Sequence, residues 1–268
     1  MSIIHNSLPA GRQVYSSFTN MIYLYTILFH QPLLNLLVFF YNTIAFHDLG
    51  LSIIFLTILV RLILFPIFQK SVRTQTVMQY LQPKIKKIQE DHKHDLKKQS
   101  ETMMELYREH RVNPFSGFFL LIIQLPILIA LYRVFMQPLS AEVFSQLYTF
   151  IPAPGELGHS LLGLINLNEK SMVIVGLAVI AQYIQGQLSI RKTKNEGKLD
   201  AAQRMTRNMI FISPVITLIF LMYLPAAVGL YWLTTTLFTI FQQSIVNKQL
   251  ANGKLGNVYQ NNNRADGV

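Results

Sequence analysis

Arg61 is the residue in this sequence whose position most strongly indicates chemistry. It is the only charged residue between Asp48 and Lys70, in an apolar run about as long as the ~30 Å hydrocarbon core of a bilayer is thick. A guanidinium at that depth costs from about 2.5 to above 10 kcal/mol, so we expect Arg61 to face a protein interior or a hydrated cavity. Lys70 lies ~13 Å further along the helix, so Arg61 cannot readily reach the interface by snorkelling.

The predicted membrane spans supply polar partners for Arg61 but contain no Asp or Glu. Proton-coupled transporters and pumps generally carry their coupling ion on intramembrane carboxylates or histidines, so this absence argues against that class. The hydrogen bonds of Arg61 must then go to water, hydroxyls, amides, lipid phosphate or a substrate. The candidate side chains in the spans are Thr57, Gln124, Gln182, Gln185 and the Thr234–Thr236 cluster. Each taken singly fits an ordinary helix-to-helix hydrogen bond, but together with Arg61 they indicate a polar groove within the bilayer.

The composition is that of a membrane protein. Of 268 residues, 51% are hydrophobic and only 13% are charged, whereas about a quarter of the residues of a soluble domain are charged. The chain has no cysteine, which excludes disulfides, iron–sulfur clusters, thiol catalysis and a lipid anchor on cysteine. His92 and His94 lie in a Lys-rich loop that does not clearly offer further ligands, and no phosphate-binding glycine motif is present. We therefore expect neither a metal nor another cofactor.

The apolar runs predict an all-α polytopic membrane protein with five transmembrane helices around the polar groove. The predicted spans are 49–70, 114–137, 171–189, 209–224 and 226–246. Asn113 and Pro114 fit the N-cap and first position of the second span, and Pro126 should kink it. Only Pro225 and its neighbours separate the last two spans, which must therefore be antiparallel neighbours.

Residues 71–111, between the first two spans, predict a helical hairpin. Apolar residues recur at helical spacing on both sides of the loop DHKHD. Pro83 cannot sit comfortably inside one continuous helix, so we expect a break there, with Pro83 in the first turn of a new helix.

Residues 1–31 form an N-terminal extension, which is either partly disordered or a signal-anchor-like segment, and we expect residues 1–20 to be poorly ordered. A His-Gln-Pro sequence interrupts the apolar run that continues from it. An amphipathic helix lying in the membrane interface over 32–45 fits this pattern best. A true span over 14–34 is the alternative, and it would place the N-terminus in the cytoplasm.

The basic residues, which give a net charge of +10, gather on one side of the five-span topology. Lys and Arg number ten in 70–111, six in 191–207 and three in the polar tail 248–268, which is nineteen of the twenty-three in the chain. By the positive-inside rule these segments and the C-terminus are cytoplasmic, and the loop 138–170 is external. The basic charge is thus topological, and nucleic acid is not expected as a partner.

Several segments taken together resemble the YidC family of membrane protein insertases, which also has mitochondrial and chloroplast branches. They are LVRLILFP, QPKIKKIQEDHKHD, MMELYREHRVNPFSG, QLPILIALYRVF and GLYWLTTTLFTIFQQ, and the resemblance covers about residues 32–247. It implies a five-helix insertase core, an amphipathic external helix before the first span and a mobile cytoplasmic hairpin, in a bacterial inner membrane. It also implies a groove that is open to the cytoplasm and to lipid but closed to the outside.

The resemblance assigns roles to three groove residues. Arg61 matches the family's groove arginine and offers its donors and fixed charge to carboxylates on a substrate's external tail. Gln185 in YIQGQ and Trp232 in GLYW match a groove glutamine and a groove tryptophan, which offer an amide and an apolar face. The implied function is that of an insertase and folding chaperone, not of an enzyme, and it requires no nucleotide or other cofactor.

The implied partners are nascent membrane protein substrates and the lipid bilayer. The ribosome, through the basic segments 71–111 or 191–207, and the Sec translocon are further candidates. The runner-up function is a small channel or anion transporter that uses Arg61 as a selectivity charge. It predicts a pore open to both faces, whereas an insertase groove should admit water from the cytoplasm only.

Overall fold

The computed structural model describes residues 20–136, 141–155, 158–189 and 201–252. Five predicted segments therefore lie partly outside the described residues. The parts outside are the N-terminal extension up to residue 19, residue 137 of the second span, residues 138–140 and 156–157 of the loop 138–170, the second basic loop over 190–200 and the polar tail from residue 253.

The described chain is mostly helical, as the sequence predicts. The helices are η1 Thr26–His30, α2 Gln31–Thr43, α3 Leu49–Ile63, α4 Phe65–Asp91, α5 Leu96–Glu109, α6 Ser116–Met136, α7 Ala141–Phe144, α8 Met172–Ser189, α9 Ala201–Leu221 and α10 Ala226–Ala251. Two short strands, β1 Ser160–Leu161 and β2 Ile165–Asn166, pair antiparallel in the loop between α7 and α8.

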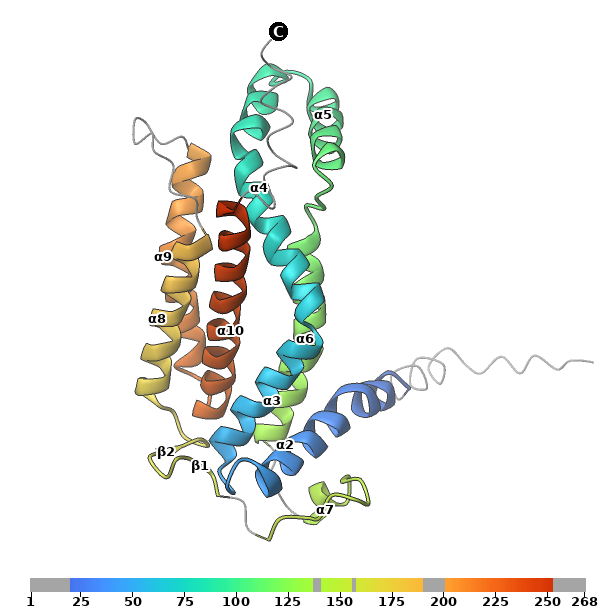
Figure 1. Ribbon diagram of the computed structural model, residues 1–268, viewed down its shortest axis with the longest axis vertical. Coiled ribbons are helices and arrows are strands. Elements are labelled where there is room, and N and C mark those ends of the chain that lie inside the picture. The colour runs from blue at the N-terminus through green and yellow to red at the C-terminus, as the bar shows by residue number, and fades with distance from the viewer. Residues whose placement is uncertain (1–19, 137–140, 156–157, 190–200, 253–268) are drawn as a thin grey trace, which may run out of the picture.

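Helix α10 is the centre of the bundle. It packs against α3 and against α8, and α8 in turn packs against α9 (Figure 1). The approach of α8 to α10 is close, because a Cβ atom on Gly229 would stand 2.9 Å from Cγ2 of Ile174. The largest cluster of buried apolar side chains joins α2, α3, α6 and α10 and gives the bundle its core.

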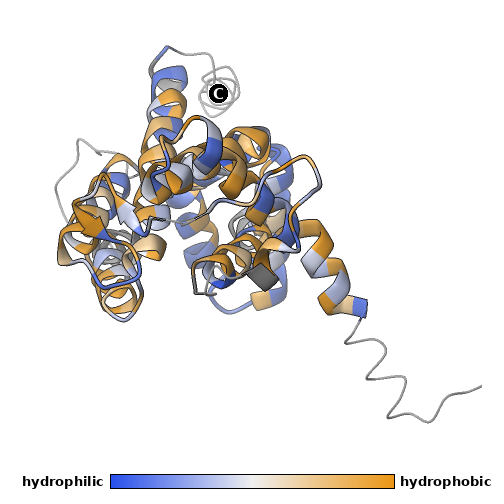
Figure 2. Cartoon of the chain, turned by 90° about the horizontal axis from the view of Figure 1, so that it is seen from below, coloured by the Kyte–Doolittle hydropathy of each residue, from blue (hydrophilic) through white to orange (hydrophobic). Residues whose placement is uncertain are grey.

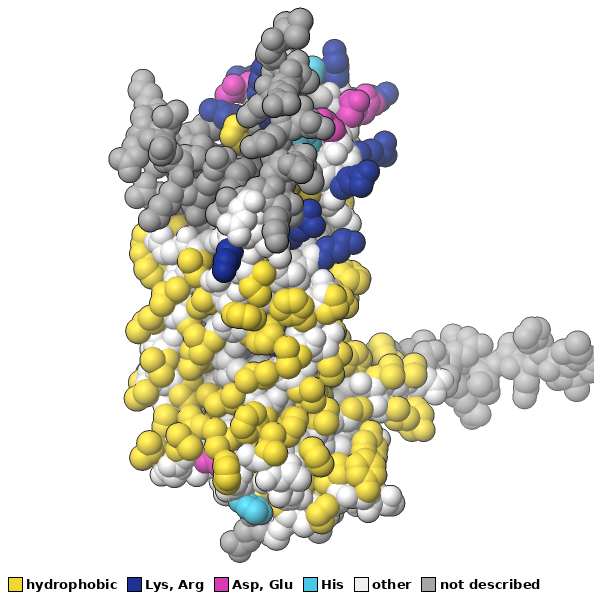
Figure 3. All heavy atoms as spheres, viewed as in Figure 1, with side chains coloured by type: hydrophobic (Ala, Val, Ile, Leu, Met, Phe, Trp, Pro, Cys, Tyr) yellow, Lys and Arg dark blue, Asp and Glu magenta, His cyan; other side chains and the backbone are white. Residues whose placement is uncertain are grey.

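Hydrophobic side chains cover the middle of the bundle, as the face drawn in Figure 3 shows, whereas charged side chains gather at the end formed by α4 and α5. Figure 2, which views the chain from the opposite end, shows hydrophobic residues on most of the helices. Two described helices are long and apolar enough to cross a membrane, Asn20–Thr43 and Met172–Ser189, and a third if α3 and α4 count as one bent span. Shorter apolar helices cover Ile122–Phe135 and Ile210–Leu221, so the five-span topology stays a prediction.

The first predicted span, 49–70, is not one straight helix. Helices α3 and α4 meet at Leu64 with a bend of 72°. Pro66 in the first turn of α4 explains the break, because proline lacks the N–H that would continue the helical ladder and its ring clashes with the carbonyl group four residues earlier. The bend leaves the C-terminal end of α3 inside the apolar run.

The predicted break at Pro83 is wrong. Helix α4 continues through Pro83 without interruption. Leu81 and Ile85, on either side of it, are buried in the apolar cluster that α4 forms with α5. Packing against α5 therefore holds the helix together where the backbone loses one hydrogen bond.

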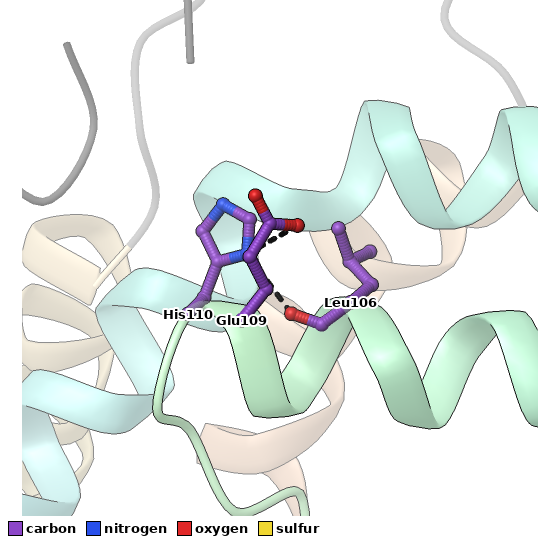
Figure 4. Close-up of polar contacts among 3 residues, drawn as sticks. All are labelled: Leu106, Glu109 and His110. Atoms are coloured by element: carbon purple, nitrogen blue, oxygen red, sulfur yellow. Dashed lines mark hydrogen bonds and ion pairs between the residues drawn. The ribbon is translucent and has the colours of Figure 1, made fainter. Parts of the chain in front are cut away.

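The C-terminal end of α5 is capped by the side chain of His110 (Figure 4). Its Nδ1 atom donates to the carbonyl oxygen of Leu106 at 2.9 Å, and a carboxylate oxygen of Glu109 lies 3.8 Å from the same nitrogen. The side chain of Asn113 then caps a turn, and α6 begins at Ser116, two residues later than predicted. These contacts give the link between the α4–α5 pair and α6 a defined shape.

The N-terminal helix continues through the predicted interruption. The chain is helical from Asn20 to Thr43, and the His-Gln-Pro sequence lies where the π-helical turn η1 meets α2. The wider π turn accommodates Pro32, which lacks a backbone N–H. Figure 1 shows α2 running obliquely to α8, α9 and α10. The interfacial position predicted for 32–45 stays a prediction beside the alternative of a span.

The loop between α6 and α8 covers the end of the bundle at which α3 and α10 begin. Asp48 caps the N-terminus of α3 and also accepts a hydrogen bond from the backbone N–H of Leu162 at 2.5 Å. The backbone N–H of Ala226, at the start of α10, donates to the carbonyl oxygen of Glu169 at 2.7 Å. Helices α3 and α10 therefore start together beneath this loop and run in the same direction.

Candidate functional site

Arg61 lies in the last turn of α3, directly before the bend into α4. Its side chain is buried, with 6% of its surface exposed. The carbonyl end of a helix favours a cation, so the end of α3 lowers the cost of holding the guanidinium there. The ring of Phe68, in the first turn of α4, lies 4.2 Å from the guanidinium carbon and adds a cation–π contact. The two side chains meet because the chain bends between them.

The guanidinium keeps one buried nitrogen free. Nη1 of Arg61 has no hydrogen-bond partner, and no carboxylate of the described residues forms an ion pair with Arg61. The phenol of Tyr231 on α10 interacts with Arg61 electrostatically, and it accepts a hydrogen bond from Nε2 of Gln124 on α6. Side chains of α3, α6 and α10 therefore form one polar cluster, in which Nη1 of Arg61 is left without an acceptor.

More buried polar atoms without a partner belong to residues of α4 and α10. They are Oε1 of Gln69, Oγ1 of Thr235 and both Nε2 and Oε1 of Gln242, and the side chain of Gln242 is completely buried. We use the name polar seam for the facing sides of α3, α4 and α10. Arg61, Gln69, Tyr231 and Gln242 lie along it. Buried polar atoms in folded proteins are almost always paired, so these unpaired atoms mark a place for water or a ligand.

Two contacts hold α4 against α10. The rings of Phe65 and Phe238 lie 6.3 Å apart. Further along both helices, Nε2 of Gln243 donates to Oγ1 of Thr76 at 3.2 Å and to Oδ1 of Asn247 at 2.9 Å. The contact that comes later along α4 also comes later along α10, so the two helices run in the same direction, as Figure 1 shows.

Gln69 and Gln242 lie between these two contacts in the sequence of their helices. Gln69 follows Phe65 by four residues, and Gln242 follows Phe238 by four residues. Residues four apart lie above one another on one face of a helix, so each glutamine shares a face with a ring that touches the other helix. Both glutamines therefore belong to the facing sides of α4 and α10.

Two of the predicted groove residues lie close to Arg61 or are joined to it through Tyr231. Thr57 is buried one turn before Arg61 on α3, and its hydroxyl donates to the carbonyl oxygen of Ile53 at 2.6 Å. Gln124 reaches the same region through its hydrogen bond to Tyr231. The structure thus brings Thr57 and Gln124 into the surroundings of Arg61.

The other predicted groove residues have contacts with α8 and α9. Nε2 of Gln182 donates to the hydroxyl of Ser213 on α9 at 2.9 Å, and the amide of Gln185 donates to a serine one turn later in α8. Trp232 packs against Phe220 on α9, with ring centroids 5.8 Å apart. Their described contacts do not join them to Arg61, so a groove shared by all of these residues stays a prediction.

Sequence reasoning misses Tyr231, Gln69 and Gln242. Tyr231 stands beside Trp232 in the GLYW motif, but the motif does not indicate which of the two rings meets the arginine. Tyr231 and Gln242 are eleven residues apart, which is about three helical turns, so their spacing does indicate a common face of α10. Gln69 lies next to Lys70 at the polar end of an apolar run, where a glutamine is ordinary and carries no signal.

The parts of the chain that the structure describes offer no clear metal site. No three His, Asp or Glu side chains gather there in a group that could hold an ion. His92 and His94 lie in the turn between α4 and α5.

Comparisons with known proteins find relatives over most of the chain. The family model described as 60Kd inner membrane protein matches residues 39–253. The chain is 30% identical over 228 residues to the membrane protein insertase YidC of Geobacter metallireducens, which covers 82% of this chain and 37% of that protein. It is 34% identical over 199 residues to the membrane protein insertase YidC of Francisella tularensis subsp. novicida, with coverages of 74% and 32%. The chain thus spans about a third of the length of these relatives.

A solved structure shares the fold. It is described as an active YidC insertase crystal structure with the first transmembrane domain resolved. The TM-score is 0.51 and the sequence identity 23%, over 89% of this chain and 47% of that one. At this level of identity the likeness is one of fold.

Proposed function

Because the chain belongs to the family of the 60Kd inner membrane protein, we propose that it is a membrane protein insertase and chaperone. In this proposal it moves short hydrophilic tails of nascent membrane proteins across the bilayer and releases their apolar segments into lipid. Relatives that are 30% and 34% identical carry the name membrane protein insertase. The activity is transport and folding, so it needs neither a catalytic residue nor a cofactor.

The observation that carries the proposal is the buried Arg61 with a free Nη1 atom and no carboxylate partner among the described residues. A carboxylate on the substrate's tail supplies the missing partner during insertion. Hydrogen bonds between charged groups contribute about 1.5–3 kcal/mol, which is enough to draw the tail inward without holding it. A permanent acidic partner in the protein would compete with the substrate for this charge.

Water in the polar seam lowers the cost of moving the tail. Between substrates, water pairs with the free atoms of Arg61, Gln69 and Gln242. The loop between α6 and α8, which is bonded to the starts of α3 and α10, closes the seam at the external end. The tail therefore enters from the end at which α4 and α5 lie and travels only part of the way through protein.

The topology that this mechanism needs has the α4–α5 pair, the second basic loop and the C-terminus in the cytoplasm. The protein lies in a bacterial inner membrane with five spans, and α2 lies in the external interface. The distribution of Lys and Arg supports this orientation. The α4–α5 pair receives the nascent chain, with the ribosome and the Sec translocon as further partners.

The remaining predicted groove residues guide the apolar segment of the substrate in this proposal. Gln182 and Gln185 offer amides on α8, and Trp232 offers an apolar face on α10. Since α8 exposes large hydrophobic side chains to its surroundings, a substrate helix that leaves the groove meets lipid directly on this side. The apolar segment then slides into the bilayer along the first, third and last spans.

Insertion by the purified protein in liposomes tests the proposal. A small membrane protein with a short acidic external tail is presented to the vesicles, and the fraction of tails protected from added protease is measured. We expect protection in vesicles that contain the protein and little protection in empty ones. Protection no greater than in empty vesicles contradicts the insertase function, and a steady ion flux through the protein without substrate favours the channel alternative.

A further inference from the structure

Gln242 differs from the other glutamines of the bundle core in having both ends of its amide unpaired. Its side chain is completely buried, and neither Nε2 nor Oε1 has a partner. By contrast, Gln124 donates to Tyr231, and Gln243 donates to Thr76. A buried amide that stabilised the bundle would be paired in the same way, so Gln242 has no evident role in holding α10 to its neighbours.

We propose that Gln242, together with Gln69, binds the peptide backbone of the translocating tail. The inference rests on the proposed insertase function and names a second contact in the same polar seam. A primary amide has a donor and an acceptor in one plane, which matches the C=O and N–H of a single residue in an extended chain, because these two groups point to the same side. Oε1 of Gln69, also buried and unpaired, accepts a further backbone N–H.

The chemistry of the two glutamines distinguishes their ligand from that of Arg61. Arg61 has a positive charge and selects acidic groups, whereas an uncharged amide has no preference for the sign of a side-chain charge. Every residue except proline has a backbone N–H and every residue has a C=O group, so a backbone contact accepts nearly any tail sequence. The pair Gln69 and Gln242 therefore provides sequence-independent affinity, and Arg61 adds selectivity for acidic tails.

The positions of Gln69 and Gln242 place the backbone contact before the contact with Arg61 on the path of an entering tail. Both lie beyond Arg61 and Tyr231 along α4 and α10, toward the end of the bundle where α5 packs on α4. A tail that enters from that end meets Gln242 before it reaches Arg61. The backbone contact then holds the tail while its side chains reach the charge.

Replacing Gln242 by Leu tests the proposal, because leucine is of similar size and has no polar atom. We expect insertion to fall about fivefold, which corresponds to one lost hydrogen bond, and to fall equally for acidic and for neutral tails. The apparent Tm of the variant should stay the same or rise, since the substitution removes an unpaired buried amide. Gln187→Leu is the matched control, because Gln187 is exposed on α8 and lies outside the seam, and it should leave insertion unchanged.

A synthetic substrate whose tail is made of N-methylglycine separates backbone binding from other roles. Such a tail keeps its C=O groups but has no backbone N–H for Oε1 of Gln242 and Gln69 to accept. The advantage of the wild-type protein over the Gln242→Leu variant should therefore be smaller for this tail than for an ordinary one. Equal insertion of ordinary tails by the wild type and the Gln242→Leu variant overturns the proposal. So does a lowered Tm with an equal fold-loss of insertion for ordinary and for N-methylglycine tails, because that pattern is structural. If the wild-type protein inserts no substrate, the insertase function itself fails.

Discussion

Replacing Arg61 by Ala is expected to lower the insertion of substrates with acidic tails by about tenfold or more. The variant loses a charged donor whose hydrogen bond to a carboxylate contributes about 1.5–3 kcal/mol. Substrates with neutral tails should be affected much less, because they use no carboxylate. The rate of tail protection from protease in proteoliposomes, measured for a matched pair of acidic and neutral substrates, checks this result.

Two controls separate the charge from the fold. Arg61→Lys should retain most of the insertion, if the positive charge rather than the guanidinium fork is what matters. The Ala variant should not be less stable than the wild type in a thermal melt, because it removes a buried charge without an acidic partner among the described residues. Full insertion of acidic tails by the Ala variant contradicts the proposed role of Arg61.

Replacing Gly50 by Ala is expected to destabilise the protein by about 2 kcal/mol, or roughly 5 °C in apparent Tm. A Cβ atom at Gly50 would stand 2.6 Å from Cβ and 2.9 Å from Cα of Leu161. The side chain of Leu161 cannot rotate away from its own Cα, so the strand pair must move off the start of α3. That movement also weakens the hydrogen bond from Leu162 to Asp48 that fixes the loop.

Gly176→Ala is the matched control for this substitution. Gly176 lies in α8, and a Cβ atom there would have no atom within 4 Å. Alanine should therefore keep or raise the stability, since it forms helices better than glycine by up to about 1 kcal/mol. If Gly50→Ala melts like the wild type while the loop between α6 and α8 stays resistant to protease, the close packing of this loop on α3 is not what holds it.

Local patterns in the sequence were enough to place several helices. The third predicted span, 171–189, differs from α8 by one residue at its start, and the last, 226–246, begins where α10 begins. Hydropathy and helical periodicity are properties of a short segment and do not depend on its neighbours. The positions of these helices could therefore be predicted without knowing how the helices pack.

The two prolines Pro66 and Pro83 show where such reading stops. Leu62 and Ile63, which lie shortly before Pro66, are exposed in the bundle, so their side chains do not oppose the bend. Pro83 is flanked by buried residues that pack on α5, and the helix continues through it. Proline weakens a helix to a similar degree in both places, and tertiary contacts decide whether the helix breaks.

The same limit applies to the candidate site. The position of Arg61 in an apolar run was enough to single it out, since the cost of a buried charge is independent of fold. Its neighbours Phe68 and Tyr231 depend on the bend at Leu64 and on the packing of α10, which no local pattern encodes. Gln242 became a candidate only when both of its polar atoms proved to be buried and unpaired.

Labelling of single cysteines with a membrane-impermeant thiol reagent tests the central claim most directly, because the chain has no native cysteine. Single cysteines at positions 61, 69 and 242 are tested in vesicles of both orientations, with cysteines in place of the exposed residues Leu62 and Ile63 as controls. We predict labelling at 61, 69 and 242 from the cytoplasmic side only, and none at the two controls. Labelling of position 61 from the outside, or from neither side, contradicts a hydrated seam that opens to the cytoplasm and is closed externally.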